Sequence, residues 1–129
     1  MQHASLVAFL SGALTPEAFM TEIACEVAEF YADLQETSHG FILISDGPPF
    51  VMTPSAARRL LTAVSTGQVS SDAAVYVADC IVASDDIEFE DDVTRDAISF
   101  LEDDSARFID GRNDPWTTEQ LSKVLASLD

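Results

Sequence analysis

Residues 15–36, TPEAFMTEIACEVAEFYADLQE, indicate the fold class more clearly than any other part of the chain. Thr15, Pro16 and Glu17 are typical of a helix start, because threonine caps free amides, proline fits the first turn and glutamate faces the positive helix end. Apolar residues then recur at i, i+4, i+8, i+11 and i+15. We therefore predict an amphipathic helix to about Glu36, with the inward stripe Phe19, Ile23, Val27, Phe30 and Leu34.

The rest of the chain contains further helix starts followed by apolar stretches. A short first helix is expected to end near Gly12, and others are expected at about 53–67, 70–84, 90–101 and 117–128. Thr117 or Thr118 caps the last of these, and Thr117 with Gln120 has capping-box spacing. The helix at 90–101 is expected to bury Phe89, Val93, Ala97, Phe100 and Leu101. The fold class is therefore all-α, a single-domain bundle of five or six short helices over residues 1–129.

Two short segments depart from the helical pattern. The first combines an apolar run at 41–44 with the turn Asp46-Gly47-Pro48-Pro49 and the apolar residues 50–52. This pattern leaves open a small hairpin or an extended loop at 41–52. In the second, Ile87 and Phe89 alternate with acidic residues, so three or four residues could be extended, but we favour a turn that leads into the next helix.

The charge balance restricts the partners of this protein. Its 129 residues include 23 acids and 6 bases, a formal net charge of −17. Such a charge disfavours binding to nucleic acid or to an anionic membrane surface, and it favours a basic protein partner. An acidic host proteome would produce the same balance without any functional role. No stretch approaches the ~18 apolar residues that span a membrane, and the first residues do not read as a signal peptide.

The residue types needed for catalysis or metal binding are sparse. His3 and His39 are expected to be solvated loop residues, and no nucleophile-elbow, P-loop or metalloprotease motif occurs, so we predict no enzyme activity and no cofactor. Calcium is disfavoured because Glu90 or Asp91 would occupy the glycine position of an EF-hand loop. Cys25 and Cys80 lack disulfide or zinc spacing, and both are predicted to be buried free thiols in a cytoplasmic protein.

The acidic run from Ser84 to Asp104 is the main candidate for a binding site. It contains ten carboxylates and one base, Arg95. Apolar residues between the acids are expected to hold them on a fixed scaffold, where they could take the place of phosphates before a basic partner. Trp116 is expected either to pack its helix against the bundle or to serve as an exposed anchor. The predicted partner-binding residues are Asp85, Asp86, Glu88, Glu90, Asp91, Asp92, Glu102, Asp103, Asp104 and Trp116.

Two stretches carry a resemblance to a known group of proteins. Residues 7–23, VAFLSGALTPEAFMTEI, form a short apolar helix, a glycine, a capped turn and a second helix; residues 67–92, GQVSSDAAVYVADCIVASDDIEFEDD, end in the acidic run. The chain thereby resembles small helical bacterial immunity proteins of the colicin-D type and related polymorphic-toxin groups. The resemblance implies a helical cytoplasmic protein that blocks a cognate toxin, often a nuclease, with acidic side chains.

We therefore expect an acidic protein-binding inhibitor, most concretely an immunity protein that neutralises a basic toxin. A secretion chaperone is the first alternative, and it would dimerise around an unfolded effector segment. A calcium-dependent regulator or enzyme is the second, and an adaptor or structural subunit whose charge reflects its host is the third. The sequence leaves a homodimer open.

Overall fold

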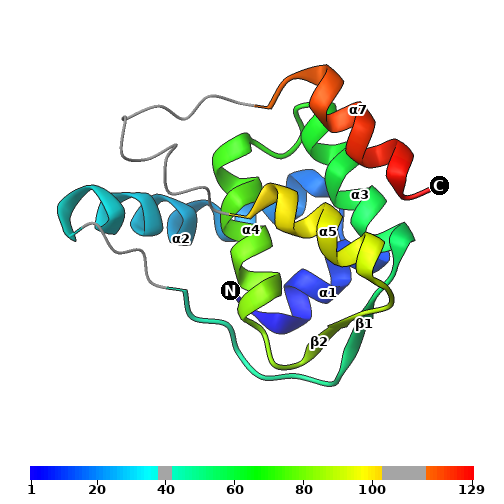
Figure 1. Ribbon diagram of the computed structural model, residues 1–129. Helices are drawn as coiled ribbons and strands as arrows, with labels where there is room; N and C mark the ends of the chain where they lie inside the picture. The colour runs from blue at the N-terminus through cyan, green and yellow to red at the C-terminus, as the bar shows by residue number, and fades with distance from the viewer. Residues whose placement is uncertain (38–41, 103–115) are drawn as a thin grey trace.

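The computed structural model describes residues 1–37, 42–102 and 116–129. In these ranges the chain is mostly helical, as predicted, with one pair of short strands at one end of the helices (Figure 1). The elements follow the order α1 (His3–Ser11), α2 (Pro16–Thr37), β1 (Phe50–Met52), α3 (Pro54–Ser65), α4 (Ser71–Ala83), β2 (Ile87–Phe89), α5 (Asp92–Leu101) and α7 (Thr118–Ser127).

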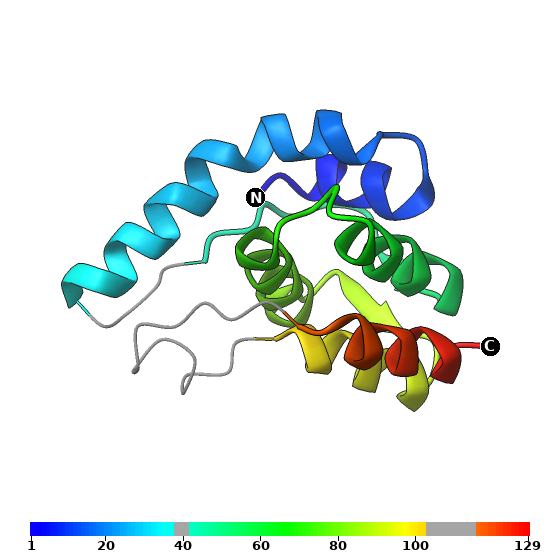
Figure 2. The same ribbon diagram turned by 90° about the horizontal axis from the view of Figure 1, so that it is seen from above.

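Helix α2 begins where the threonine–proline pair predicted. Thr15 Oγ1 accepts a hydrogen bond from the Ala18 N–H at 3.2 Å. The predicted stripe faces the other helices: Phe19, Ile23 and Phe30 are buried, and Val27 and Leu34 are half-buried. The ring of Phe19 stacks on that of Phe9 in α1, with centroids 4.5 Å apart. The last turns of α2 reach beyond the other helices (Figure 2).

The other predicted caps are present as well. Thr53 and Ser70 each accept a hydrogen bond from the backbone N–H three residues further on, at 3.1 and 3.2 Å. Thr117 and Gln120 form a full capping box, because each side chain accepts a hydrogen bond from the other residue's backbone N–H. These bonds satisfy amides that have no partner within their own helix, so local sequence defines where α3, α4 and α7 begin.

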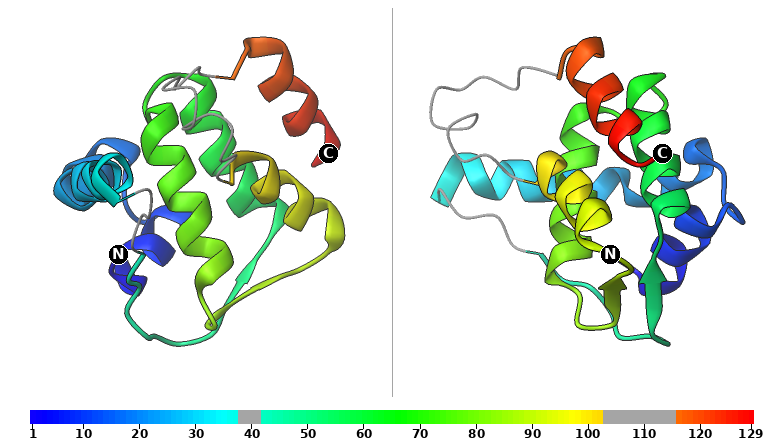
Figure 3. Two further views of the ribbon diagram at one scale, coloured as in Figure 1. Left: turned by 60° about the vertical axis from the view of Figure 1, so that its left-hand side comes forward. Right: turned by 45° about the vertical axis from the view of Figure 1, so that its right-hand side comes forward.

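Helix α4 lies in the middle of the molecule, with α2, α3 and α5 packed against it (Figure 3). Most of its residues are buried, which explains why it shows no clear polar face. The buried set is Ala73, Ala74, Val75, Tyr76, Val77, Ala78, Cys80 and Ile81.

The two strands decide between the alternatives left open at 41–52 and correct the turn favoured at 87–89. A hairpin within the described part of 41–52 is wrong, since residues 42–49 contain no strand and follow an extended path instead. Residues 50–52 pair in parallel with 87–89, where we expected a turn, and Phe50 lies opposite Ile87. The Phe50 N–H donates to Asp86 O, and the Glu90 N–H donates to Met52 O. Because α3 and α4 separate the strands along the chain, no local pattern could reveal this pairing.

Helix α5 also differs from its predicted form. It begins at Asp92, two residues later than expected, and its buried residues are Thr94, Ala97, Ile98 and Leu101. Val93 is 46% exposed, so its predicted burial is wrong. Phe89 and Phe100 are half-buried. Strand β2 and the N-cap at Asp91 determine which face of α5 points toward the core. Polar Thr94 is on that face, although the apolar pattern predicted Val93 there.

The two cysteines have different environments. Cys80 is buried as predicted, whereas Cys25 is exposed on α2, which contradicts its predicted burial. Burial raises the pKa of the Cys80 thiol to about 12. The same effect raises the pKa of the neighbouring Tyr76 hydroxyl. Cys80 therefore behaves as a small apolar side chain in the core.

Candidate functional site

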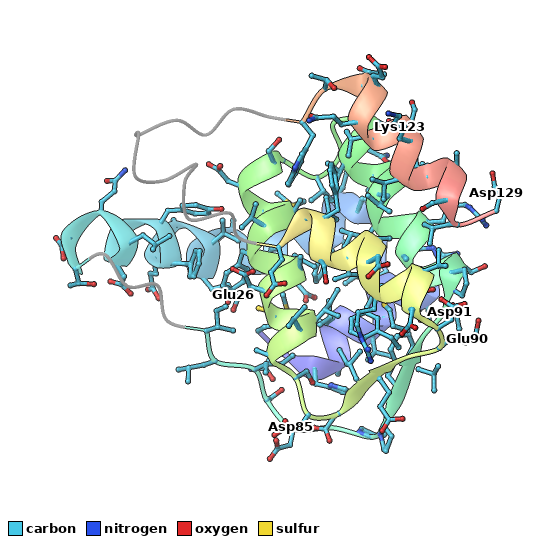
Figure 4. All side chains as sticks on the ribbon, in the orientation of Figure 1. Glu26, Asp85, Glu90, Asp91, Lys123 and Asp129 are labelled. Carbon is cyan, nitrogen blue, oxygen red and sulfur yellow. The ribbon has the colours of Figure 1, made fainter. Side chains whose placement is uncertain are left out.

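Six of the predicted site residues lie along one continuous strip of chain. We call Asp85, Asp86, Glu88, Glu90, Asp91 and Asp92 the acidic strip; it runs from the end of α4, along β2, to the start of α5. Asp85 lies at one end of β2, and Glu90 and Asp91 lie at the other (Figure 4). Because an extended chain rises by about 3.4 Å per residue, Asp85 and Asp91 are at most about 20 Å apart. The strip therefore follows an edge of the molecule that a partner could contact along its length.

Strand β2 holds the middle of the strip in position. Ile87 is buried and Glu88 is exposed, as alternation along a strand requires. Glu88 lies opposite Val51 of β1, whose side chain is 50% exposed. This outer face thus combines a carboxylate with an exposed apolar side chain, a feature that sequence reasoning missed because the pairing is non-local.

Two residues at the end of the strip have structural roles. Asp91 is the N-cap of α5, and its Oδ1 accepts a hydrogen bond from the Thr94 N–H at 2.8 Å. Interactions with the Thr94 side chain and with the Thr94 backbone N–H lower the pKa of the Asp91 carboxyl. Asp92 is in the first turn, where a negative charge complements the helix dipole. Part of the acidic run is therefore explained by helix formation.

Asp86 also has a structural role. Its carboxylate Oδ2 accepts a hydrogen bond from the Gly47 N–H at 3.2 Å, and its own N–H donates to Ser84 Oγ. The side chain is half-buried. Asp86 thereby joins the start of β2 to the extended segment that precedes β1.

The remaining acids of the strip, Asp85, Glu88 and Glu90, are exposed. Within the described residues, none of their carboxylates has a hydrogen bond or ion pair. Of the arginines that the structure describes, Arg58 pairs with Asp129 and Arg59 donates to Leu10 O. These three carboxylates are therefore available to an external cation.

Arg95, the single base of the run, forms an ion pair with only one residue of the strip among the described residues. Its guanidinium lies over the Phe89 ring, 5.5 Å from the centroid, and its Nη1 is 3.7 Å from Asp92 Oδ1. That exposed pair is near the length limit of an ion pair and contributes little.

Of the other predicted site residues, Glu102 and Trp116 do not belong to the strip. Glu102 follows the last residue of α5, and a ten-residue helix places it about 15 Å from the Asp91 end. Asp103 and Asp104 lie outside the described residues. Trp116 is half-buried, with its ring centroid 5.9 Å from that of Phe100, which confirms its packing role.

A second feature, which sequence reasoning missed, surrounds His3. This residue is 3% exposed, so the expectation of a solvated histidine is wrong; His39 lies outside the described residues. The His3 N–H donates to Ser45 Oγ, and its ring Nε2 lies 2.9 Å from Pro48 O. A groove of about 560 Å³ runs beside it, lined by Ala4, Val7 and Ala8 of α1 and by residues 45–50; we call it the α1 groove.

The extended segment is attached to the start of the chain by a buried charge. The Met1 amino group donates to Leu43 O at 2.7 Å and lies 3.0 Å from Glu26 Oε2. The Ser45 N–H donates in turn to Met1 O. Glu26 lies on the inner side of α2, toward α4 (Figure 4). These bonds hold one wall of the α1 groove.

The described residues contain no group of three or more histidine, cysteine, aspartate or glutamate side chains placed to hold a metal ion. None of the helices in the described ranges is both long and apolar enough to span a membrane. Comparison with protein-family models, with curated proteins and with solved structures finds no match for this chain.

Proposed function

We propose that this protein binds a basic protein partner through the acidic strip and inhibits it. The observation that supports the proposal is the state of Asp85, Glu88 and Glu90, which are exposed and have no counter-ion among the described residues. Fixed carboxylates without counter-ions form strong charge-assisted bonds with arginine and lysine, and they also speed the approach of a basic partner.

The most concrete form of this proposal is an immunity protein that neutralises a basic bacterial toxin in the cytoplasm. An inhibitor of a nucleic-acid-binding toxin needs carboxylates where phosphates would otherwise bind, and the strip offers a linear series of them. The exposed Val51 and Val93 beside the strip would add apolar contact. The role is binding, with no catalytic step assigned to the chain.

Charge reversal at the strip tests the proposal. The triple variant Asp85→Lys, Glu88→Lys and Glu90→Lys should weaken binding to the partner by about 100-fold or more, while helicity by circular dichroism stays unchanged. The partner is first captured from the native host at low salt, or taken as the protein encoded by the neighbouring reading frame. Affinity is then measured by titration calorimetry.

The matched control is Glu17→Lys, Glu22→Lys and Glu29→Lys on the exposed face of α2, which changes the net charge by the same amount. It should retain most of the affinity. Equal losses in both variants would mean that overall charge, and not the strip, attracts the partner. Unchanged affinity in the strip variant would refute the site.

Light scattering separates this function from a secretion chaperone. We expect a monomer before the partner is added and a complex of defined stoichiometry afterwards. A stable dimer that binds unfolded segments would favour the chaperone instead.

A further inference from the structure

The α1 groove combines a rigid, mainly apolar lining with an acidic rim. Val7, Pro49 and Phe50 supply large apolar surfaces, and Ala4 and Ala8 leave room between them. Asp46 is exposed at the rim, and the hydrogen bond from Gly47 to Asp86 places the acidic strip next to it. Apolar walls with a few polar groups are typical of ligand-binding pockets, and the size of this groove falls within their usual range.

The wall formed by residues 45–50 is fixed before any ligand binds. Pro48 and Pro49 restrict the backbone torsions of the segment. Gly47 packs directly on the His3 ring, where a Cβ at position 47 would overlap the ring carbons. A preformed groove loses little conformational entropy on binding, which favours affinity.

His3 carries an unmet hydrogen-bonding requirement in the lining of the groove. Because the Pro48 carbonyl can only accept, Nε2 must carry the proton in their 2.9 Å bond. In the neutral ring Nδ1 is then an acceptor, and it is buried without a partner among the described residues. Buried polar groups normally have partners, so Nδ1 is an exception; it is shielded from the open groove and is not itself a contact for a ligand there.

We propose that the α1 groove binds an aromatic or long aliphatic side chain of the partner, with an adjacent lysine or arginine placed at Asp46. The apolar lining selects the first group, and the carboxylates of Asp46 and of the strip select the second. A second copy of this chain is a poor occupant, because two molecules of charge −17 repel each other. The inference rests on the proposed function for the nature of the partner, but the chemistry of the groove is testable without it.

The direct test uses small probes and two-dimensional amide NMR. 2-Phenylethylammonium carries both groups, 3-phenylpropionate carries the ring with an anion, and ethylammonium carries the cation alone. We expect saturable shifts from the first probe at the amides of Ala4, Val7, Gly47 and Phe50, with binding about tenfold weaker for each of the other two. Shifts scattered over the surface, or equal binding of the anionic probe, would overturn the proposal.

Three variants test the location of the site and its preference for a cation. Ala4→Phe fills the groove from an exposed position on α1 and should abolish the shifts, whereas Ala28→Phe, at an exposed position on α2, should not. Asp46→Asn keeps the shape and should remove the preference for the ammonium over the carboxylate. Retained binding in Ala4→Phe would contradict the site.

The same variants separate this inference from the function of the strip. If charge reversal at Asp85, Glu88 and Glu90 abolishes partner binding and Ala4→Phe does not weaken it, the groove proposal fails while the proposed function stands. If probes bind the groove but strip reversal leaves partner affinity unchanged, the proposed function fails while the groove chemistry stands.

Discussion

The Asp86 carboxylate accepts a hydrogen bond from the Gly47 N–H at 3.2 Å, which links the two features that we assign to binding. Asp86 belongs to the acidic strip, and Gly47 belongs to the wall of the α1 groove. The residues are 39 positions apart, so the contact exists only because β1 and β2 pair in parallel. Asp85, Glu88 and Glu90, the residues reversed in the strip variant, take no part in this hydrogen bond, so the two features can be tested separately.

The close packing of Gly47 on His3 predicts a size-specific defect. Gly47→Ala should destabilise the protein by about 1–3 kcal/mol, because the added methyl group overlaps the imidazole ring. Urea unfolding followed by circular dichroism measures the change. The double variant His3→Ala, Gly47→Ala should cost less than the sum of the two single changes, since removal of the ring removes the overlap.

Gly67→Ala provides the comparison for this prediction. Gly67 has a φ of 78° and open space around the added Cβ, so the cost there should be about 1 kcal/mol of backbone strain alone. Because no neighbouring side chain contacts the added Cβ, shortening a second residue should not reduce this loss of stability. For the first pair, if the stability losses of His3→Ala and Gly47→Ala simply added in the double variant, the proposed steric overlap between the Cβ added at position 47 and the His3 ring would be refuted.

The Asp91 cap predicts a pH-dependent contribution to stability. Because the folded-state pKa of Asp91 is lowered, its ionised form stabilises the fold above the unfolded-state pKa of about 4, and this stability is lost as the pH falls through the folded pKa. Asp91→Asn keeps the capping geometry without the charge. The variant should therefore be less stable than the wild type at pH 7 and converge with it in acid.

Urea midpoints between pH 7 and pH 2.5 measure this convergence. Glu90→Gln, one residue earlier and without a capping bond, should follow the wild-type profile. A constant difference between Asp91→Asn and the wild type at all pH values would contradict the assigned role.

The cap of the central helix predicts a defined loss of stability. Ser70→Ala removes the hydrogen bond to the Ala73 N–H and should cost about 1 kcal/mol. Ser65→Ala, at an exposed position in the last turn of α3, should change stability by less than about 0.5 kcal/mol. Chemical denaturation of both variants provides the measurement, and equal effects would argue against the cap.

The two cysteines should differ in reactivity toward a thiol reagent. Cys25 is exposed, whereas burial raises the pKa of Cys80 to about 12, so Cys80 has almost no thiolate at pH 8. We expect one thiol to react rapidly in the folded protein and the second only in denaturant. Cys25→Ser should remove the fast phase; if it persists, the assignment is wrong.

Local features of the chain were predicted well because their causes are local. The caps at Thr15, Thr53, Ser70 and Thr117 depend on side chains within three residues of the amides they satisfy. The exposure of Asp85, Glu88 and Glu90 agrees with the prediction of a displayed acidic run. Their proposed contact with a partner stays a prediction.

The sequence by itself determined that the chain forms amphipathic helices with defined starts and carries a large negative charge, because hydrophobic periodicity, capping and charge are properties of neighbouring residues. Only the tertiary structure decided that 50–52 pairs with 87–89, that His3 is buried against Pro48, and that Val93 points outward. Each of these depends on contacts between residues far apart in the chain. A local sequence pattern cannot predict them, because it contains no information on the free energy of such contacts.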